Sequence, residues 1–168
     1  MNSFFGIHIW RFLVLLLVQV GICNHINFMG YINPYIYIIF ILLFPINNNR
    51  QVFLIVSFLL GMLIDIFSDS GGVHAAASLV LAYSRPLILK SSFGLMYDYQ
   101  SVKFSHSDFG SLFTYIIIAT ILHHMVLFTL EVFNLSLILL ILKKVVFSSI
   151  FTCILSLIIL ILFSKGKR

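Results

Sequence analysis

Long apolar runs, separated by short polar connections, make up most of this 168-residue sequence. Hydrophobic residues account for 61% of the chain and charged residues for only 9%, whereas soluble domains carry roughly 25% charged residues. Ten basic and five acidic side chains are too few to cover a water-facing globule. The composition therefore excludes a lone soluble domain, a disordered tail and a nucleic-acid-binding protein, and it predicts an all-α integral membrane protein.

The lengths of the apolar runs indicate how often the chain crosses the membrane. A hydrocarbon core of ~30 Å requires about 20 residues of helix, and the candidate runs cover about residues 7–23, 35–46, 51–68, 73–91, 109–133 and 145–163. The second run is short and lies between Asn33-Pro34 and Pro45, so a re-entrant or interfacial segment is its alternative. We expect six transmembrane helices in a single domain over residues 1–168.

The placement of lysine and arginine supports six spans rather than five. Cytoplasmic ends of spans carry an excess of these residues. With six spans, Lys143 and Lys144 lie on one side, and the other side collects the remaining basic residues: Arg11, Arg50, Arg85, Lys90, Lys103, Lys165, Lys167 and Arg168. Without the second span the division would be seven against three. Both termini are therefore predicted to be cytoplasmic (N-in, C-in).

Several ionisable side chains fall inside the predicted third and fourth spans, where each is costly and therefore a candidate functional residue. Asp65 lies near the end of the third span, and the short turn at residues 69–72 makes the two spans antiparallel neighbours. The fourth span carries a stripe at helical spacing, formed by His74, Ser78 and Arg85. The hairpin thus joins a carboxylate on one arm to a basic stripe on the other.

Depth in the membrane indicates which partners are within reach. At ~1.5 Å per residue, Asp65 and His123 both lie about 21 Å from the cytoplasmic start of their helices. We therefore expect Asp65 to reach His74 or His123 more easily than Arg85. The Arg85-Pro86 step is predicted to break the helical hydrogen bonding and to leave carbonyls for the guanidinium.

Three further polar residues belong to the predicted fifth span. His123 and His124 are adjacent, so they point to different faces, and Glu131 at the outer end is expected to pair with Lys143 or Lys144. The favoured interpretation is that such groups satisfy one another and hold helices in register. The sequence contains no catalytic motif, no cofactor-binding motif and no metal-ligand spacing, so we do not expect an enzyme.

A known family has the same order of residues in its central hairpin. This chain resembles the rod shape-determining protein MreD family, in its Bacteroidetes-type form, over residues 58–90, FLLGMLIDIFSDSGGVHAAASLVLAYSRPLILK. Residues 24–37 and 123–133 also look like the family, so the resemblance covers nearly the whole chain. The matching positions in the hairpin are Gly61, Asp65, Gly72, His74, Arg85 and Pro86.

The resemblance implies a non-enzymatic, multi-pass subunit of the cell-elongation complex in the bacterial inner membrane. Such a subunit binds an MreC-like partner and works with MreB, RodA and a class B penicillin-binding protein in lateral peptidoglycan synthesis and the regulation of cell shape. The family's fold is thought to resemble the substrate-binding subunits of energy-coupling-factor transporters. With membrane lipid around it and no cofactor, the hairpin would hold the structure or the partner through Gly61, Asp65, Asp69, Gly72, His74, Arg85 and Pro86.

Two alternatives remain open from the residues themselves. A small-molecule-binding transporter subunit is favoured by short loops and a polar hairpin. It is disfavoured because the first span lacks the alanines, four residues apart, through which such subunits dock. A proton or metal site would be built on Asp65 and the intramembrane histidines.

Overall fold

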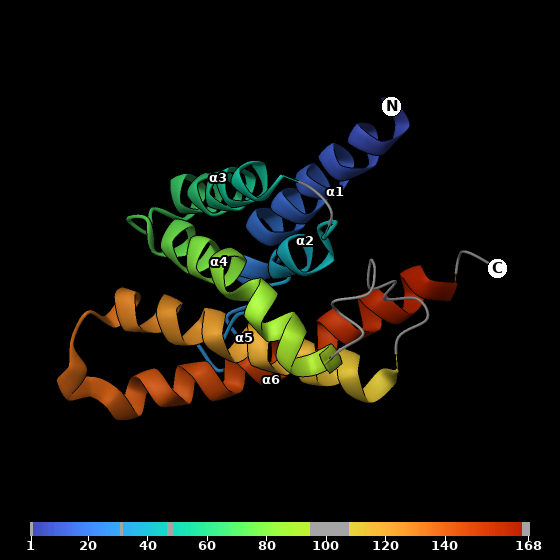
Figure 1. The fold of residues 1–168 in the computed structure, drawn as a ribbon. Helices are drawn as coiled ribbons and strands as arrows, with labels where there is room; N and C mark the ends of the chain where they lie inside the picture. Colours follow the sequence, from blue (N-terminus) through green and yellow to red (C-terminus); the bar gives the residue numbers. More distant parts are fainter. Residues whose placement is uncertain (1, 31, 47–48, 95–107, 166–168) are drawn as a thin grey trace.

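The computed structural model describes residues 2–30, 32–46, 49–94 and 108–165, with side chains over 6–30, 32–46, 49–94 and 108–160. This part of the chain is helical and contains no strand element (Figure 1). Two 3-10 turns, η1 (Cys23–His25) and η4 (Leu135–Leu137), accompany the helices. The helices are α1 (Asn2–Gly21), α2 (Ile38–Leu43), α3 (Arg50–Ser68), α4 (Val73–Phe93), α5 (Phe109–Val132) and α6 (Ile138–Lys165).

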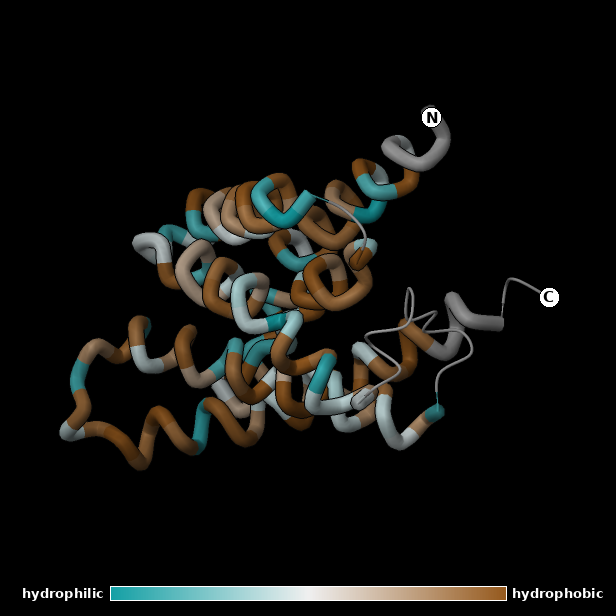
Figure 2. Tube along the Cα trace, in the orientation of Figure 1, coloured by the Kyte–Doolittle hydropathy of each residue, from teal (hydrophilic) through white to brown (hydrophobic). Residues whose placement is uncertain are grey.

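Four stretches of the described residues are long and apolar enough to cross a membrane. Apolar residues cover most of these helices over their length (Figure 2), and many of their large hydrophobic side chains are exposed. Lipid tails, unlike water, are a suitable solvent for such a surface. The fold is therefore that of an all-helical membrane protein with candidate spans at Gly6–His25, Arg50–Ser68, Phe109–Val132 and Leu135–Leu160.

Helix α4 is long enough to span a membrane but is more polar than these four stretches. Its 21 residues extend about 32 Å, and it packs against both α3 and α5. The polar side chains His74, Ser78 and Arg85 are all buried. Because neighbouring helices cover its polar side chains, α4 does not need the hydropathy of a lipid-facing helix.

The predicted second span, residues 35–46, is wrong as one continuous helix. Helix α2 has six residues, about 9 Å, and irregular backbone precedes it. Protein at membrane depth tolerates irregular backbone only where its polar groups find partners. Here the Tyr35 N–H donates to Thr152 Oγ1 (3.0 Å), and Gln19 Nε2 donates to the Pro34 carbonyl (3.1 Å). Residues 34–42 are buried throughout, so the segment lies inside the bundle.

This buried segment runs antiparallel to α1. At its start, the Tyr37 N–H donates to Gln19 Oε1 (3.4 Å). At its end, the ring of Phe44 lies 5.7 Å from that of His8. Gln19 and His8 are eleven residues apart on α1, which is about 16 Å along the helix axis. The chain therefore returns along most of α1 before α3 begins.

The bundle has two distinct ends (Figure 1). The connections α3–α4 and α5–α6 lie at one end, the hairpin end, where Asn24 Nδ2 also donates to Ser68 Oγ (2.7 Å). The first turns of α1 and the last turns of α6 lie at the other, the terminal end. The Phe44 ring lies 4.9 Å from that of Phe53 in the first turn of α3. The described helices α1, α3, α4, α5 and α6 each run between these two ends, and the segment at 33–44 returns along α1.

The other boundaries differ from expectation mainly at α1 and α6. Helix α1 begins at Asn2 rather than near residue 7, and α6 begins at Ile138 rather than near residue 145. Residues 135–142, an apolar stretch between the predicted fifth and sixth spans, form η4 and the start of α6. Most of residues 92–108, the polar connection between the predicted fourth and fifth spans, lies outside the described residues.

Candidate functional site

Asp65 closes the N-terminal end of α4. Its carboxylate accepts hydrogen bonds from the His74 N–H (3.0 Å), the Ala75 N–H (2.8 Å) and the Ser70 hydroxyl (2.6 Å). The first N–H groups of a helix have no partner within the helix, and a carboxylate there is also favoured by the helix dipole. Asp65 thus meets His74, as expected, but through the backbone amide rather than the imidazole.

The two arms of the hairpin touch backbone to backbone at Gly61. A Cβ placed on Gly61 would lie 2.6 Å from the Ala75 Cα and would also overlap the His74 carbonyl. No real side chain fits there, so only glycine permits this approach. The turn that follows uses positive φ angles at Asp69 (51°) and Gly72 (95°). Glycine tolerates such angles freely and Asp more readily than most residues.

Tyr37 joins two of the intramembrane histidines. Its hydroxyl lies 3.2 Å from His74 Nδ1 and 2.7 Å from His123 Nε2. A hydroxyl has one hydrogen to donate and lone pairs to accept with, so Tyr37 can serve both rings at once. The other ring nitrogen of His123, Nδ1, is buried and has no hydrogen-bond partner among the described residues. Three elements, the buried segment, α4 and α5, are thereby linked.

His124 bonds a different set of groups. Its Nδ1 lies 2.7 Å from the Thr120 carbonyl, and its Nε2 lies 3.4 Å from Thr152 Oγ1 on α6. The ring of Tyr35 packs edge-on against that of His124, with 5.2 Å between centroids. Adjacent in sequence, His123 and His124 therefore bind different elements and do not act as a pair of ligands.

Arg85 holds the end of α2. Its Nη2 donates to the carbonyls of Leu42 (2.9 Å) and Phe44 (2.5 Å), and its Nε donates to the Tyr115 hydroxyl (3.0 Å). The last carbonyls of a helix have no partner within it and carry negative partial charge, which suits a guanidinium. Pro86 does not end α4, which continues to Phe93. The carbonyls that bind Arg85 come from the last turn and the C-cap of α2, and not from a broken α4 as the sequence predicted.

Glu131 pairs with Lys144, one of the two partners expected for it. Lys144 Nζ lies 2.7 Å from Glu131 Oε1, which joins the end of α5 to the start of α6. Exposed ion pairs of this kind typically stabilise a fold by ~1 kcal/mol or less. The pair is therefore a local anchor for the α5–α6 connection.

Sequence reasoning missed four residues of this polar network: Gln19, Tyr37, Tyr115 and Thr152. An isolated glutamine in an apolar helix was the one signal available, because intramembrane amides are rare and usually bonded. The two tyrosines gave no comparable signal, since tyrosine is common in membrane helices for its apolar ring.

Two cavities open beside these residues. The hairpin-end cavity measures about 390 Å³ and includes Asn24, Tyr35, His74 and Glu131 in its lining. The terminal-end cavity measures about 240 Å³ and includes Arg50, Phe53 and Arg85. The polar lining of the first consists of amides, hydroxyls, two imidazoles and a carboxylate that is already paired, whereas arginine is the only charged residue type in the described lining of the second.

The histidines and acidic residues do not converge on a common point. Within the described ranges, no three His, Cys, Asp or Glu side chains are arranged to hold a metal ion. Both carboxylate oxygens of Asp65 accept hydrogen bonds from hydroxyl and amide donors. The histidine rings pack against one another and against tyrosine. The arrangement links helices together and presents no ligand set.

Comparisons with known proteins give no relative for this arrangement. No protein-family model matches the chain, no curated protein is similar to it, and no solved structure matches its fold.

Proposed function

We propose that this chain is a non-enzymatic, MreD-like subunit of the cell-elongation complex in the bacterial inner membrane. The observation that carries the proposal is the structural role of the hairpin residues that resemble the MreD family. Gly61 makes room for the α4 backbone, Asp65 closes the start of α4, and Arg85 binds the end of α2. These residues stabilise helix packing, which is the task of a scaffold subunit.

The proposal includes six passes with both termini in the cytoplasm. It is supported by the path of the buried segment at 33–44, which returns along α1 and so keeps the later helices alternating in direction. It is also supported by the charges, since Arg11 and Arg50 belong to the terminal end while Lys143 and Lys144 belong to the hairpin end. Such an asymmetry orients membrane proteins.

The partner surface is proposed to lie on the outward side of α1. Trp10 and Leu17 on this helix are 67% and 68% exposed, and large apolar side chains offer contact area to a neighbouring helix. A single-span, MreC-like protein would cover this face, with MreB, RodA and a class B penicillin-binding protein joining the same complex.

Co-purification tests the proposal directly. We expect the tagged full chain, extracted in mild detergent, to retain the MreC-like protein of its own genome and to release an unrelated single-span protein of similar size. Trp10→Ala and Leu17→Ala should weaken retention, whereas Leu87→Ala, on the outside of α4 and 73% exposed, should not. No retention above the control, together with normal cell width after depletion of the chain, would exclude the elongation role.

A second candidate is a small-molecule-binding subunit, favoured by the hairpin-end cavity. Its volume of about 390 Å³ falls in the range typical of ligand pockets, roughly 300–1,000 Å³. Native mass spectrometry of the purified chain distinguishes the two functions. A small polar molecule retained at one copy per chain, without any protein partner, would favour this candidate.

A further inference from the structure

Arg85 is a buried cation without an acidic partner in the described part of the chain. It is only 3% exposed, and its hydrogen bonds all go to neutral groups, two carbonyls and the Tyr115 hydroxyl. These bonds use Nε and Nη2. The structure gives no bond to Nη1 from any described residue, and this nitrogen remains available. The guanidinium also lies over the Phe53 ring, with 5.1 Å from Cζ to the ring centroid. A buried charge that is compensated by dipoles and an aromatic face, without a carboxylate, favours the approach of an anion.

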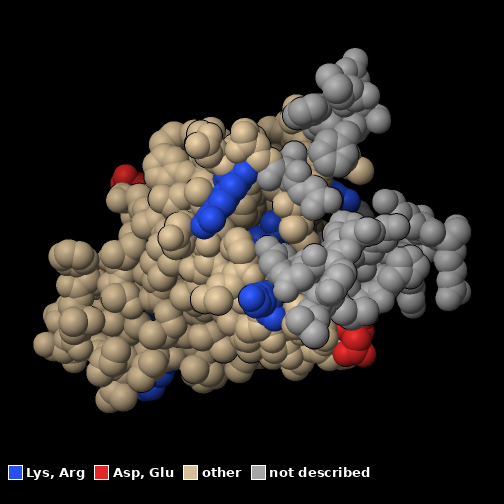
Figure 3. Space-filling model, in the orientation of Figure 1, with Lys and Arg blue, Asp and Glu red and all other residues tan. Residues whose placement is uncertain are grey.

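The terminal-end cavity gives an anion access to this residue. Arg85 lines the cavity together with Arg50, and the walls are apolar, formed by Ile46, Phe53 and Leu89. The described lining contains no Asp or Glu. Figure 3 shows basic atoms gathered over the middle of this face, some of them recessed, and acidic atoms only toward its margins. The electrostatic field of the cavity is therefore positive.

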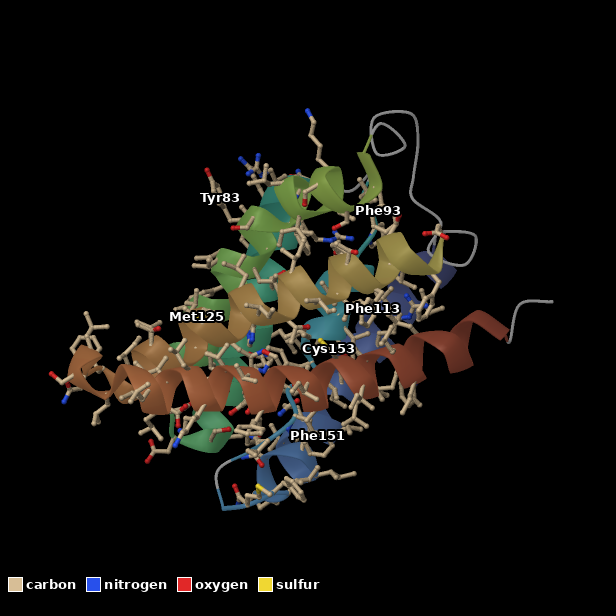
Figure 4. All side chains as sticks on the ribbon, turned by 90° about the horizontal axis from the view of Figure 1, so that it is seen from below. Tyr83, Phe93, Phe113, Met125, Phe151 and Cys153 are labelled. Carbon is tan, nitrogen blue, oxygen red and sulfur yellow. The ribbon has the colours of Figure 1, made fainter. Side chains whose placement is uncertain are left out.

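Arg50 is held at the mouth of the cavity with its guanidinium accessible. The side chain is exposed and stacks over the ring of Tyr83, with 5.1 Å from Cζ to the ring centroid. Tyr83 lies on the outward side of α4 (Figure 4), where lipid would surround it. Stacking restrains the guanidinium without using its N–H donors. Two arginines, the buried Arg85 and the exposed Arg50, thus line one small space.

We propose that the terminal-end cavity binds a phosphate group, presented by an anionic lipid headgroup or by free phosphate. Planar guanidinium groups match phosphate oxygens in pairs, and basic pockets between membrane helices on the cytoplasmic side are typical sites for anionic headgroups. A volume of about 240 Å³ is below the usual range of small-molecule pockets, so it suits a headgroup better than a whole metabolite. The proposal does not depend on the elongation role.

Lipid retention by the full chain tests the site. The chain is reconstituted in nanodiscs of phosphatidylcholine with and without phosphatidylglycerol, released in the mass spectrometer, and scored for bound lipid. We expect preferential retention of phosphatidylglycerol. Arg50→Gln should reduce that retention about ten-fold, the effect of losing one charge-assisted pair. Lys90→Gln is the matched control, because Lys90 is exposed on α4 and does not line the cavity.

A second arm identifies the source of the phosphate and guards against misfolding. Thermal unfolding is followed in neutral detergent with either inorganic phosphate or short-chain phosphatidylglycerol added. A higher melting temperature with the lipid alone identifies a headgroup site, and one with inorganic phosphate identifies a site for the free ion. Arg85→Lys, which keeps the charge but loses the fork, should weaken either response if it elutes as the parent does. Equal retention of both lipids together with no rise in melting temperature from inorganic phosphate would overturn the proposal. An Arg50→Gln variant that behaves like the parent in both assays would overturn it as well.

Discussion

The Asp65 carboxylate accepts a hydrogen bond from the backbone N–H of His74 at 3.0 Å, so that a side chain of α3 closes the first turn of α4. The two residues are nine positions apart, and the turn between them requires positive φ angles. The bond therefore couples the geometry of the turn to the register of both helices. Loss of the Asp65 acceptor should therefore destabilise the packing of α3 against α4 and not only the turn.

Asp65→Ala is expected to destabilise the fold by about 1–3 kcal/mol, because it removes a helix cap and leaves buried N–H groups without an acceptor. Asp65→Asn retains one acceptor oxygen and should cost less. Thermal unfolding in detergent, followed by circular dichroism, measures both. Asp69→Asn is the control, since Asp69 is exposed and its left-handed conformation suits asparagine. An Asp65→Ala variant as stable as the parent would show that the cap is unimportant.

Gly61→Ala should disrupt the hairpin more than any other single methyl addition at a described glycine. The added Cβ meets the backbone of α4 and not a flexible side chain, so the helices must separate, at a typical cost of about 1–3 kcal/mol. Gly21→Ala provides the comparison, because a Cβ there meets no atom within 4 Å. The yield of monodisperse protein and its melting temperature report the effect. Equal values for the two variants would contradict the close approach.

Arg85→Ala leaves the Phe44 carbonyl without its donor and the Leu42 carbonyl with the Tyr115 hydroxyl alone (3.2 Å), so the anchor of α2 should weaken. We expect reduced accumulation in the membrane and easier proteolysis. Lys144→Ala, which removes the partly exposed ion-pair partner of Glu131 at the surface, should change stability by about 1 kcal/mol or less. Quantitative immunoblotting of membrane fractions compares the two. Normal accumulation of Arg85→Ala would mean that α2 is held by apolar packing alone.

Tyr37→Phe removes the hydroxyl that lies between His74 and His123 while leaving the ring in place. Two buried ring nitrogens then lose a hydrogen-bond partner, which typically costs about 1–3 kcal/mol. Tyr83→Phe, at an exposed tyrosine, should be silent in the same unfolding assay. If the two substitutions have equal effects, the Tyr37 hydroxyl does not hold the three elements together.

The six-pass arrangement predicts which residues a membrane-impermeant thiol reagent reaches in intact cells. In a background with Cys23 and Cys153 replaced by serine, Ser70→Cys and Asn134→Cys at the hairpin end should be labelled from outside. Asn49→Cys at the terminal end should be labelled only after the membrane is opened. Labelling of position 49 in intact cells would contradict the proposed passage of residues 33–44 across the membrane.

The first residues of α3 and α5 were predictable because N-cap residues mark them in the local sequence. Asn49 and Asp108 each accept a bond from a backbone N–H of the helix that follows, and both residue types are common N-caps. The broken second span was not predictable from hydropathy. An apolar run of that length has the same hydropathy whether its backbone is helical or irregular. The irregular form is stabilised by hydrogen bonds to Gln19 and Thr152, which lie far away in the sequence.

The sequence by itself determined that this protein is apolar enough for a lipid environment, that it is helical, and that α3 and α4 form a hairpin. Apolar composition, the length of the apolar runs and a four-residue turn are all properties of local sequence. Tertiary structure alone decided the partners of the polar groups. Arg85 reaches carbonyls more than 40 positions away, and Tyr37 reaches two histidines on separate helices. Such pairings depend on how helices pack in three dimensions, since a buried polar group takes whichever partner the packing brings within hydrogen-bond distance.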